Sequence, residues 1–85
     1  MTGEQLLEHA AAIFADRRAT YGEPSRLFEH IAKRWSLVLG VEVTPPQVAL
    51  CLIDLKLARL TTDPGHLDSI TDVAGYAACL REVSQ

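Results

Sequence analysis

Residues Pro46–Leu60 read PQVALCLIDLKLARL, and this stretch decides the fold. After Gln47 its only polar residues are Asp54, Lys56 and Arg59. A helix so apolar around its circumference is expected to be covered on every side, which predicts the central helix of a helical domain. At about 100° per residue, Lys56 and Arg59 share one edge while Asp54 points away from both. Each charge needs a partner, because an unpaired buried charge costs several kcal/mol.

Three further helices are predicted around this one. Apolar residues recur at helical spacing, and the predicted ranges are Gly3–Arg18, about Glu23 to a stop at Gly40, and about Pro64–Val83 with Asp63 as its cap. Capping boxes, Thr2 with Gln5 and Thr44 with Gln47, mark two of the starts. No β-alternation of any length is present. The sequence therefore predicts an all-α fold, a single four-helix domain over residues 1–85 built from two antiparallel helix pairs.

The composition limits the classes of function. A chain of 85 residues with 48% hydrophobic residues is marginal as a monomer, so we expect a homodimer or larger assembly that buries apolar surface. A net charge of -3 argues against binding nucleic acid through overall charge. No stretch approaches the roughly 18 apolar residues that a membrane span needs. Cys51 and Cys79 are interpreted as buried reduced thiols, and we expect a cytoplasmic protein of a bacterial or phage-infected cell.

The acidic residues allow two kinds of site. Asp68 and Asp72 lie one helical turn apart, which places their carboxylates about 6 Å from each other on one face. Such a pair can bind Mg²⁺ or Mn²⁺ directly or through water, with Asp54 as a third ligand. The alternative is an ion pair with Lys56 or Arg59, in which the acids only fix the packing of the last two helices.

The basic residues are candidate phosphate ligands. Lys56 and Arg59 form one basic edge, and Arg17, Arg18 and Arg26 flank the turn after the first helix. Arginine can grip a phosphate with two nitrogens and lysine acts as a point charge, but both also form ordinary ion pairs. Candidate substrate contacts are Tyr21 in that turn, Tyr76 and His66. The favoured interpretation of Tyr76 is a core aromatic, and that of His66 is a helix cap or a surface residue.

These residues follow a recognisable order along the chain: Arg18 with Tyr21-Gly22, Phe28, Ile31-Ala32, Trp35, Val48-Ala49, Leu55-Lys56, Ala58-Arg59-Leu60, His66, Asp68-Ser69, Asp72 and Ala74-Gly75-Tyr76-Ala77. This order resembles a family of small helical phage and prophage proteins over about residues 17–80. More remotely, the layout is similar to the MazG-like all-α nucleoside triphosphate pyrophosphohydrolases. Those enzymes are oligomers that hold Mg²⁺ with acids from two neighbouring helices and release pyrophosphate from nucleotides.

The remote resemblance implies a function and assigns the site. It implies a nucleotide as partner, Mg²⁺ or Mn²⁺ held by Asp54, Asp68 and Asp72, and phosphates facing Lys56 and Arg59, to which Arg18 could add. The chain departs from the enzymes because it has no Glu-x-x-Glu on its central helix and its acid pair is spaced by four. It is therefore either a divergent hydrolase or a relative without the chemistry. The alternative function is a non-catalytic helical interaction module in which the same charges form structural ion pairs.

Overall fold

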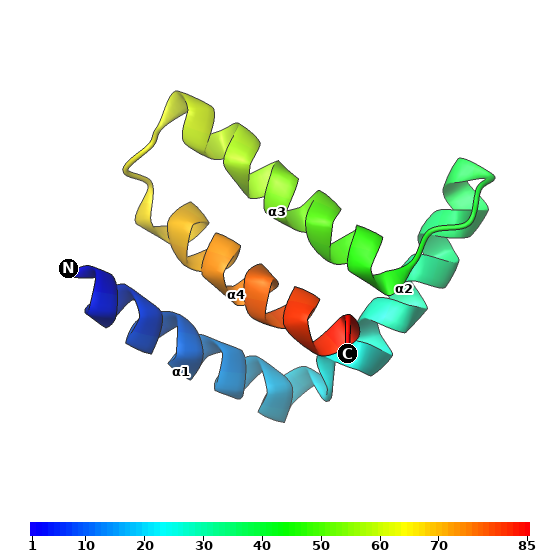
Figure 1. The fold of residues 1–85 in the computed structure, drawn as a ribbon, viewed down its shortest axis with the longest axis horizontal. Helices are drawn as coiled ribbons and strands as arrows, with labels where there is room; N and C mark the ends of the chain where they lie inside the picture. The colour runs from blue at the N-terminus through cyan, green and yellow to red at the C-terminus, as the bar shows by residue number, and fades with distance from the viewer.

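The computed structural model describes residues 1–85 as four helices without strands (Figure 1). The helices are α1 (Gly3–Tyr21), α2 (Pro24–Leu39), α3 (Pro45–Thr62) and α4 (Leu67–Val83). The prediction of an all-α, four-helix fold is confirmed. The first helix runs three residues beyond its predicted end at Arg18, because the residue that ends it is the glycine at position 22.

The starts of three helices are fixed by side chains that accept hydrogen bonds from free backbone donors. Both predicted capping boxes are present, at Thr2 with Gln5 and at Thr44 with Gln47. The start of α4 was predicted wrongly, since the helix begins at Leu67 and its cap is His66 rather than Asp63. The backbone N–H of Ser69 donates to His66 Nδ1 at 3.2 Å, which confirms the interpretation of His66 as a helix cap.

Two glycines end α1 and α2, and both have the positive φ that other residues rarely adopt. Gly22 has φ 84° and lets the chain leave α1 for Pro24, the first residue of α2. Gly40 has φ 71° and ends α2 in the left-handed conformation. Ser36 then holds the next loop in place, since its hydroxyl accepts a hydrogen bond from the Val43 backbone N–H at 2.8 Å.

The helices form one antiparallel pair instead of the two that the sequence predicted. α3 and α4 lie antiparallel and make the most extensive contact in the molecule, whereas α1 packs chiefly against α4 and hardly against α2 (Figure 1). α1 and α4 run in the same direction, and α2 crosses the molecule so that its C-terminal end projects (Figure 1). The reason is that the buried face of α2, with Phe28 and Ala32, packs on α3 and α4 instead of α1.

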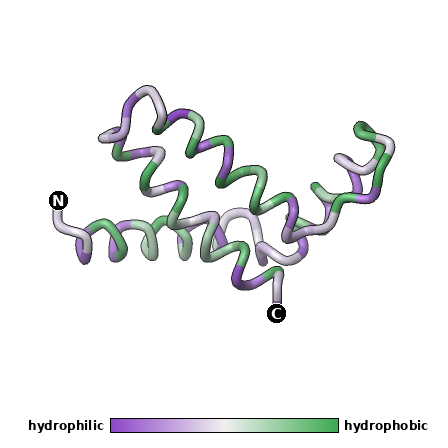
Figure 2. Tube along the Cα trace, turned by 45° about the horizontal axis from the view of Figure 1, so that its top comes forward, coloured by the Kyte–Doolittle hydropathy of each residue, from purple (hydrophilic) through white to green (hydrophobic).

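The core lies where α2 crosses the α3–α4 pair. Its fully buried members are Phe28, Ala32, Val48 and Ala49. The prediction that α3 is covered on every side is wrong for a single chain, because only one side of it faces this core. Hydrophobic residues follow α3 along most of its length (Figure 2), and the outward ones, among them Leu50, Cys51 and Leu57, are exposed.

Candidate functional site

A cleft of about 580 Å³ lies between α1, α2 and α4, and Leu52 of α3 also lines it. It exists because α1 and α2 diverge after the Gly22 turn while both remain attached to α4. Clefts of this size are typical of small-molecule sites in proteins. Most of its lining is hydrophobic, and the aromatic side chains are those of Phe14, Tyr21, Phe28 and Tyr76.

The lining of the cleft includes a glycine in the middle of a helix. Gly75 lies in the interior of α4, where glycine is destabilising by about 0.5–1 kcal/mol relative to alanine. A Cβ placed on Gly75 would meet no atom within 4 Å. No packing contact within the chain therefore explains the glycine, and its effect is to leave room in the cleft.

A buried hydroxyl lines the same cleft without a hydrogen-bond partner. Thr71 on α4 is only 4% exposed, and its Oγ1 atom has neither a donor nor an acceptor within reach. An unpaired buried polar atom costs about 1–3 kcal/mol. Thr71 is one of the residues that line the cleft, but its Oγ1 atom is closed off from solvent and so from the cleft itself.

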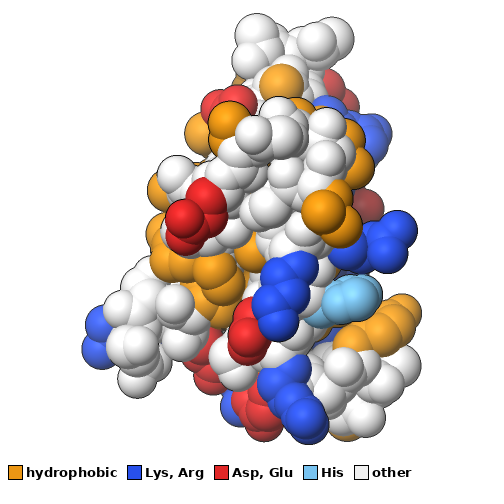
Figure 3. All heavy atoms as spheres, turned by 90° about the vertical axis from the view of Figure 1, so that its right-hand side faces the viewer, with side chains coloured by type: hydrophobic (Ala, Val, Ile, Leu, Met, Phe, Trp, Pro, Cys, Tyr) orange, Lys and Arg blue, Asp and Glu red, His pale blue; other side chains and the backbone are white.

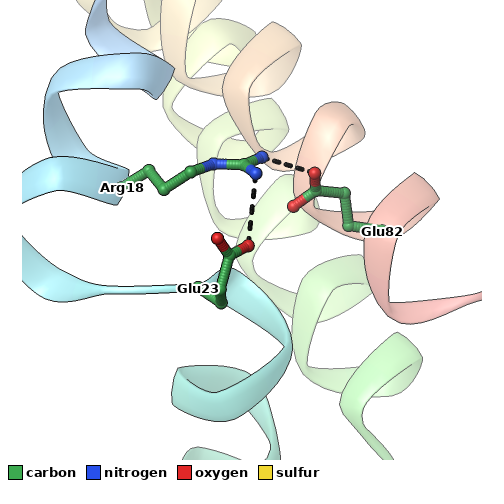
Figure 4. A network of polar contacts seen from close by, with 3 residues as sticks. All are labelled: Arg18, Glu23 and Glu82. Atoms are coloured by element: carbon green, nitrogen blue, oxygen red, sulfur yellow. Dashed lines mark hydrogen bonds and ion pairs between the residues drawn. The ribbon is translucent and has the colours of Figure 1, made fainter.

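Arg18 closes one end of the cleft by joining three segments of the chain. Its guanidinium donates to Glu82 of α4 and forms an ion pair with Glu23 at 3.2 Å (Figure 4). The hydrogen bond to Glu82 raises the pKa of Arg18 above its usual value. The guanidinium carbon also lies 5.1 Å from the centre of the Phe14 ring. Both carboxylates thus offset the charge of this predicted phosphate ligand.

Arg17 also lines the cleft, and no carboxylate pairs with its charge. It lies on α1 beside Arg18, is exposed and makes no ion pair. Tyr21, one turn further along, is 70% exposed and lines the same cleft. The mouth of the cleft therefore presents a free guanidinium and a free phenol next to apolar walls.

Asp72 and Lys56 form an ion pair between α4 and α3. Lys56 Nζ lies 2.9 Å from Asp72 Oδ2, and the two side chains are 18% and 15% exposed. This is the ion pair that the sequence left open as the alternative to metal binding. Asp72 also lines the cleft, so the pair links the α3–α4 packing to the site.

The other predicted site residues lie away from the cleft. Asp54 and Asp68 are exposed, and no three His, Cys, Asp or Glu side chains gather into a group that could hold a metal ion. The three predicted acids therefore do not fit a shared metal centre, and Mg²⁺ remains a prediction. Arg59 and His66 line a separate, smaller hollow of about 290 Å³ at the α3–α4 turn.

Four residues that the sequence assigned to different tasks line the cleft together: Arg18, Tyr21, Asp72 and Tyr76. The sequence reasoning missed Phe14, Thr71 and Gly75 as site residues. A signal that could have found Gly75 was present, since a glycine in the middle of a helical pattern costs about 1 kcal/mol relative to alanine. Thr71 carried no such signal, because an unpaired hydroxyl is a property of the folded chain alone.

The two cysteines should differ in reactivity. Burial raises the pKa of the Cys79 thiol above its usual value, and Cys79 lines the cleft, whereas Cys51 is exposed on α3. A raised pKa leaves less of the reactive thiolate at any given pH below it. We expect iodoacetamide to modify Cys51 first, and Cys79 to need a higher pH for the same rate. Mass spectrometry of labelled peptides checks this, and equal rates at both cysteines would contradict it.

The fold and the cleft define a small all-α domain with a largely apolar cleft. The chain belongs to the family described as domain of unknown function (DUF6378), which matches residues 5–84. It is similar to the Gene 55 protein of Mycobacterium phage D29, with 38% identity over 81 residues, covering 94% of this chain and 54% of that protein. It is also similar to the Gene 55 protein of Mycobacterium phage L5, with 39% identity over 80 residues, covering 92% and 51%.

These comparisons confirm the predicted membership of a phage protein family. The chain spans about half the length of the two phage relatives. No solved structure matches the chain. None of the four helices is both long enough and apolar enough to cross a membrane. The remote likeness to MazG-like enzymes, the oligomeric state and the cytoplasmic location stay predictions.

Proposed function

We propose that the cleft binds a nucleotide, with the ring system between the aromatic walls and the phosphates at the α1 side of the mouth. The observation that carries the proposal is the open space above Gly75. The glycine lowers the stability of α4, and no packing contact within the chain explains its presence there. Phe14 and Tyr76, which line the cleft, offer the apolar and aromatic surface that a base needs.

The polar groups of the cleft have distinct roles in this proposal. Arg17 binds phosphate, because it is the guanidinium at the mouth that makes no ion pair. Arg18 acts indirectly, since its bonds to Glu23 and Glu82 hold the end of α1 in position. Hydrolysis is not part of the proposal, because the three predicted acids do not form a metal-binding group.

The test is thermal melting of the protein with a panel of nucleotides, each with and without Mg²⁺. A ligand that binds only the folded chain at a hundred times its Kd adds about 2.7 kcal/mol to the free energy of unfolding, so Tm should rise by roughly 10 °C or more. A rise that requires Mg²⁺ would indicate that the nucleotide binds as its metal complex, and a rise without it would support binding through Arg17. The absence of any rise at millimolar nucleotide would contradict the proposal.

A filled cleft provides the specific control. In Gly75→Leu the side chain extends from a Cβ that meets no atom, and leucine is the better helix former by roughly 0.5–1 kcal/mol. We therefore expect a protein at least as stable as the wild type that no longer responds to nucleotide. The matched variant Ala77→Leu, at an exposed position of the same helix outside the cleft, should keep the response. Arg17→Ala should weaken binding about tenfold or more.

The second candidate function, a helical interaction module, is favoured by the polar contacts. The Lys56–Asp72 pair and the bonds of Arg18 show three of the predicted site charges joining one helix to another. Charges that pair between helices in this way stabilise the packing without a bound ligand. If the melting panel gives no shift while the oligomeric state depends on these contacts, the interaction module is the better interpretation.

A further inference from the structure

Asp72 is the one acidic residue that lines the cleft. Every other acid of the chain except Glu82 is exposed, and several exposed acids are visible in red on the face shown in Figure 3. Glu82 is bound by Arg18. The side chain of Asp72, in contrast, is only 15% exposed and lies among largely apolar walls, where a carboxylate is costly unless polar groups satisfy it.

The ion pair with Lys56 uses only part of the hydrogen-bonding capacity of this carboxylate. Lys56 Nζ lies 2.9 Å from Asp72 Oδ2, and this is the only polar contact that the carboxylate makes. An ionised carboxylate offers about four acceptor positions on its two oxygens. The Oδ1 atom is open to solvent, unlike the Oγ1 atom of Thr71. Lys56 therefore holds the carboxylate in place and leaves acceptor positions free.

Asp72 lies on the face of α4 that lines the cleft. Asp72, Gly75 and Cys79 recur at helical spacing, and all three line it. Tyr76 follows Asp72 by one turn and lines the cleft as well. A flat ring that occupies the open space above Gly75, beside Tyr76, therefore has one edge next to the carboxylate.

The cleft carries opposite charges at its two ends. α1 and α4 run in the same direction, and the contact of Arg18 with Glu82 places the last turns of these helices side by side (Figure 1). Arg17 belongs to that end, whereas Asp72 lies about nine residues earlier in α4, which is roughly 14 Å along the helix. A ligand that suits both ends is a hydrogen-bond donor at one end and an anion at the other.

We propose that the cleft prefers guanine nucleotides, with Asp72 accepting hydrogen bonds from the N1–H and the 2-amino group of the base. This inference rests on the nucleotide binding proposed above. A carboxylate only accepts hydrogen bonds, so it favours a base edge that carries donors. Guanine presents two adjacent donors, whereas adenine and cytosine present one amino group beside an acceptor, and uracil presents one N–H between two acceptors. An acceptor placed against the carboxylate is left unpaired and disfavoured.

Isothermal titration calorimetry of the wild type without Mg²⁺ tests the preference directly. We expect GDP to bind about tenfold or more tightly than ADP, CDP or UDP. Inosine diphosphate, which lacks only the 2-amino group, should bind several-fold more weakly than GDP. If no nucleotide binds, the proposed function fails and the preference fails with it. If nucleotides bind without a preference for GDP, nucleotide binding stands and the role of Asp72 is overturned.

Asp72→Asn tests the carboxylate itself. Lys56 can only donate, so it should hold the carbonyl oxygen of the amide and leave the NH₂ group towards the cleft. GDP should then bind about tenfold or more weakly. Xanthosine diphosphate has a carbonyl oxygen in place of the 2-amino group of guanine and should bind the variant more tightly than GDP does. A purely structural role would weaken both ligands equally, so a variant that still prefers GDP overturns the proposal.

The matched control is Asp68→Asn, the same change one turn earlier on α4, at an exposed position outside the cleft. It should leave the ratio of the two affinities unchanged, and an equal change in both variants would overturn the assignment to Asp72. Circular dichroism checks that each variant is helical. If Asp72→Asn does not fold, the comparison of GDP with inosine diphosphate in the wild type decides, since it needs no substitution.

Discussion

Replacing Lys56 with Met should lower the free energy of unfolding by about 3 kcal/mol, because it leaves the Asp72 carboxylate without its partner between α3 and α4. The carboxylate is only 15% exposed, so water replaces little of the lost interaction. Asp72→Leu should cost a similar amount by leaving Lys56 unpaired. For a domain of this size the change corresponds to a fall in Tm of about 10 °C or more. Urea unfolding at fixed protein concentration measures it.

The double variant Lys56→Met/Asp72→Leu is the decisive comparison. Replacing both members of a largely buried ion pair by apolar residues is often neutral, so we expect it to recover to within about 1 kcal/mol of the wild type. Asp68→Leu, an acid of the same helix at an exposed position, should change stability by no more than about 0.5 kcal/mol. Equal losses for Asp68→Leu and Asp72→Leu would show that the pair has no structural role.

The helices themselves were predictable because their signals are local. Apolar periodicity, the two capping boxes and the glycines at positions 22 and 40 act within one or two turns of the chain. The direction of α2 was not predictable. Its apolar face required burial, but nothing in the pattern of Phe28 and Ala32 says that the partner is α3 with α4 and not α1.

The outward face of α3 shows a second limit of sequence reasoning. Its composition indicates burial on every side, yet Leu50 and Leu57 are about half exposed, at 52% and 48%. The hydrophobic effect favours removing apolar surface from contact with water, and it does so whether the same chain or another molecule covers that surface. A prediction made for a single chain therefore assigns all burial to that chain, including any that belongs between chains.

The candidate site was predictable in composition and not in geometry. Tyr21 and Asp72 are 51 positions apart and reach one cleft only because α1 lies along α4. Asp54 and Asp68, in contrast, face solvent, although helical spacing alone allowed them to join Asp72. Spacing within one helix constrains distances well, whereas the distance between helices depends on packing angles that no local pattern fixes.

Replacing Phe28 with Ala should cost about 3–4 kcal/mol, which places it among the largest effects of any single substitution in this chain. Phe28 is 4% exposed and is the one aromatic among the fully buried core residues, so its removal leaves a cavity beside Ala32 and Val48. Domains of this size have roughly 4–13 kcal/mol of total stability, so the loss is a large fraction. Urea unfolding followed by circular dichroism measures it.

A comparison with Leu27→Ala separates the role of Phe28 in the core from its role in the cleft. Both residues line the cleft, but Leu27 is 41% exposed, so Leu27→Ala should cost less than about 1 kcal/mol. Because Phe28 forms both core and cleft wall, Phe28→Ala should also weaken nucleotide binding even under conditions where the protein remains folded. If Phe28→Ala and Leu27→Ala had the same free energy of unfolding, Phe28 would not be a core residue, and the placement of the core where α2 crosses α3 would be wrong.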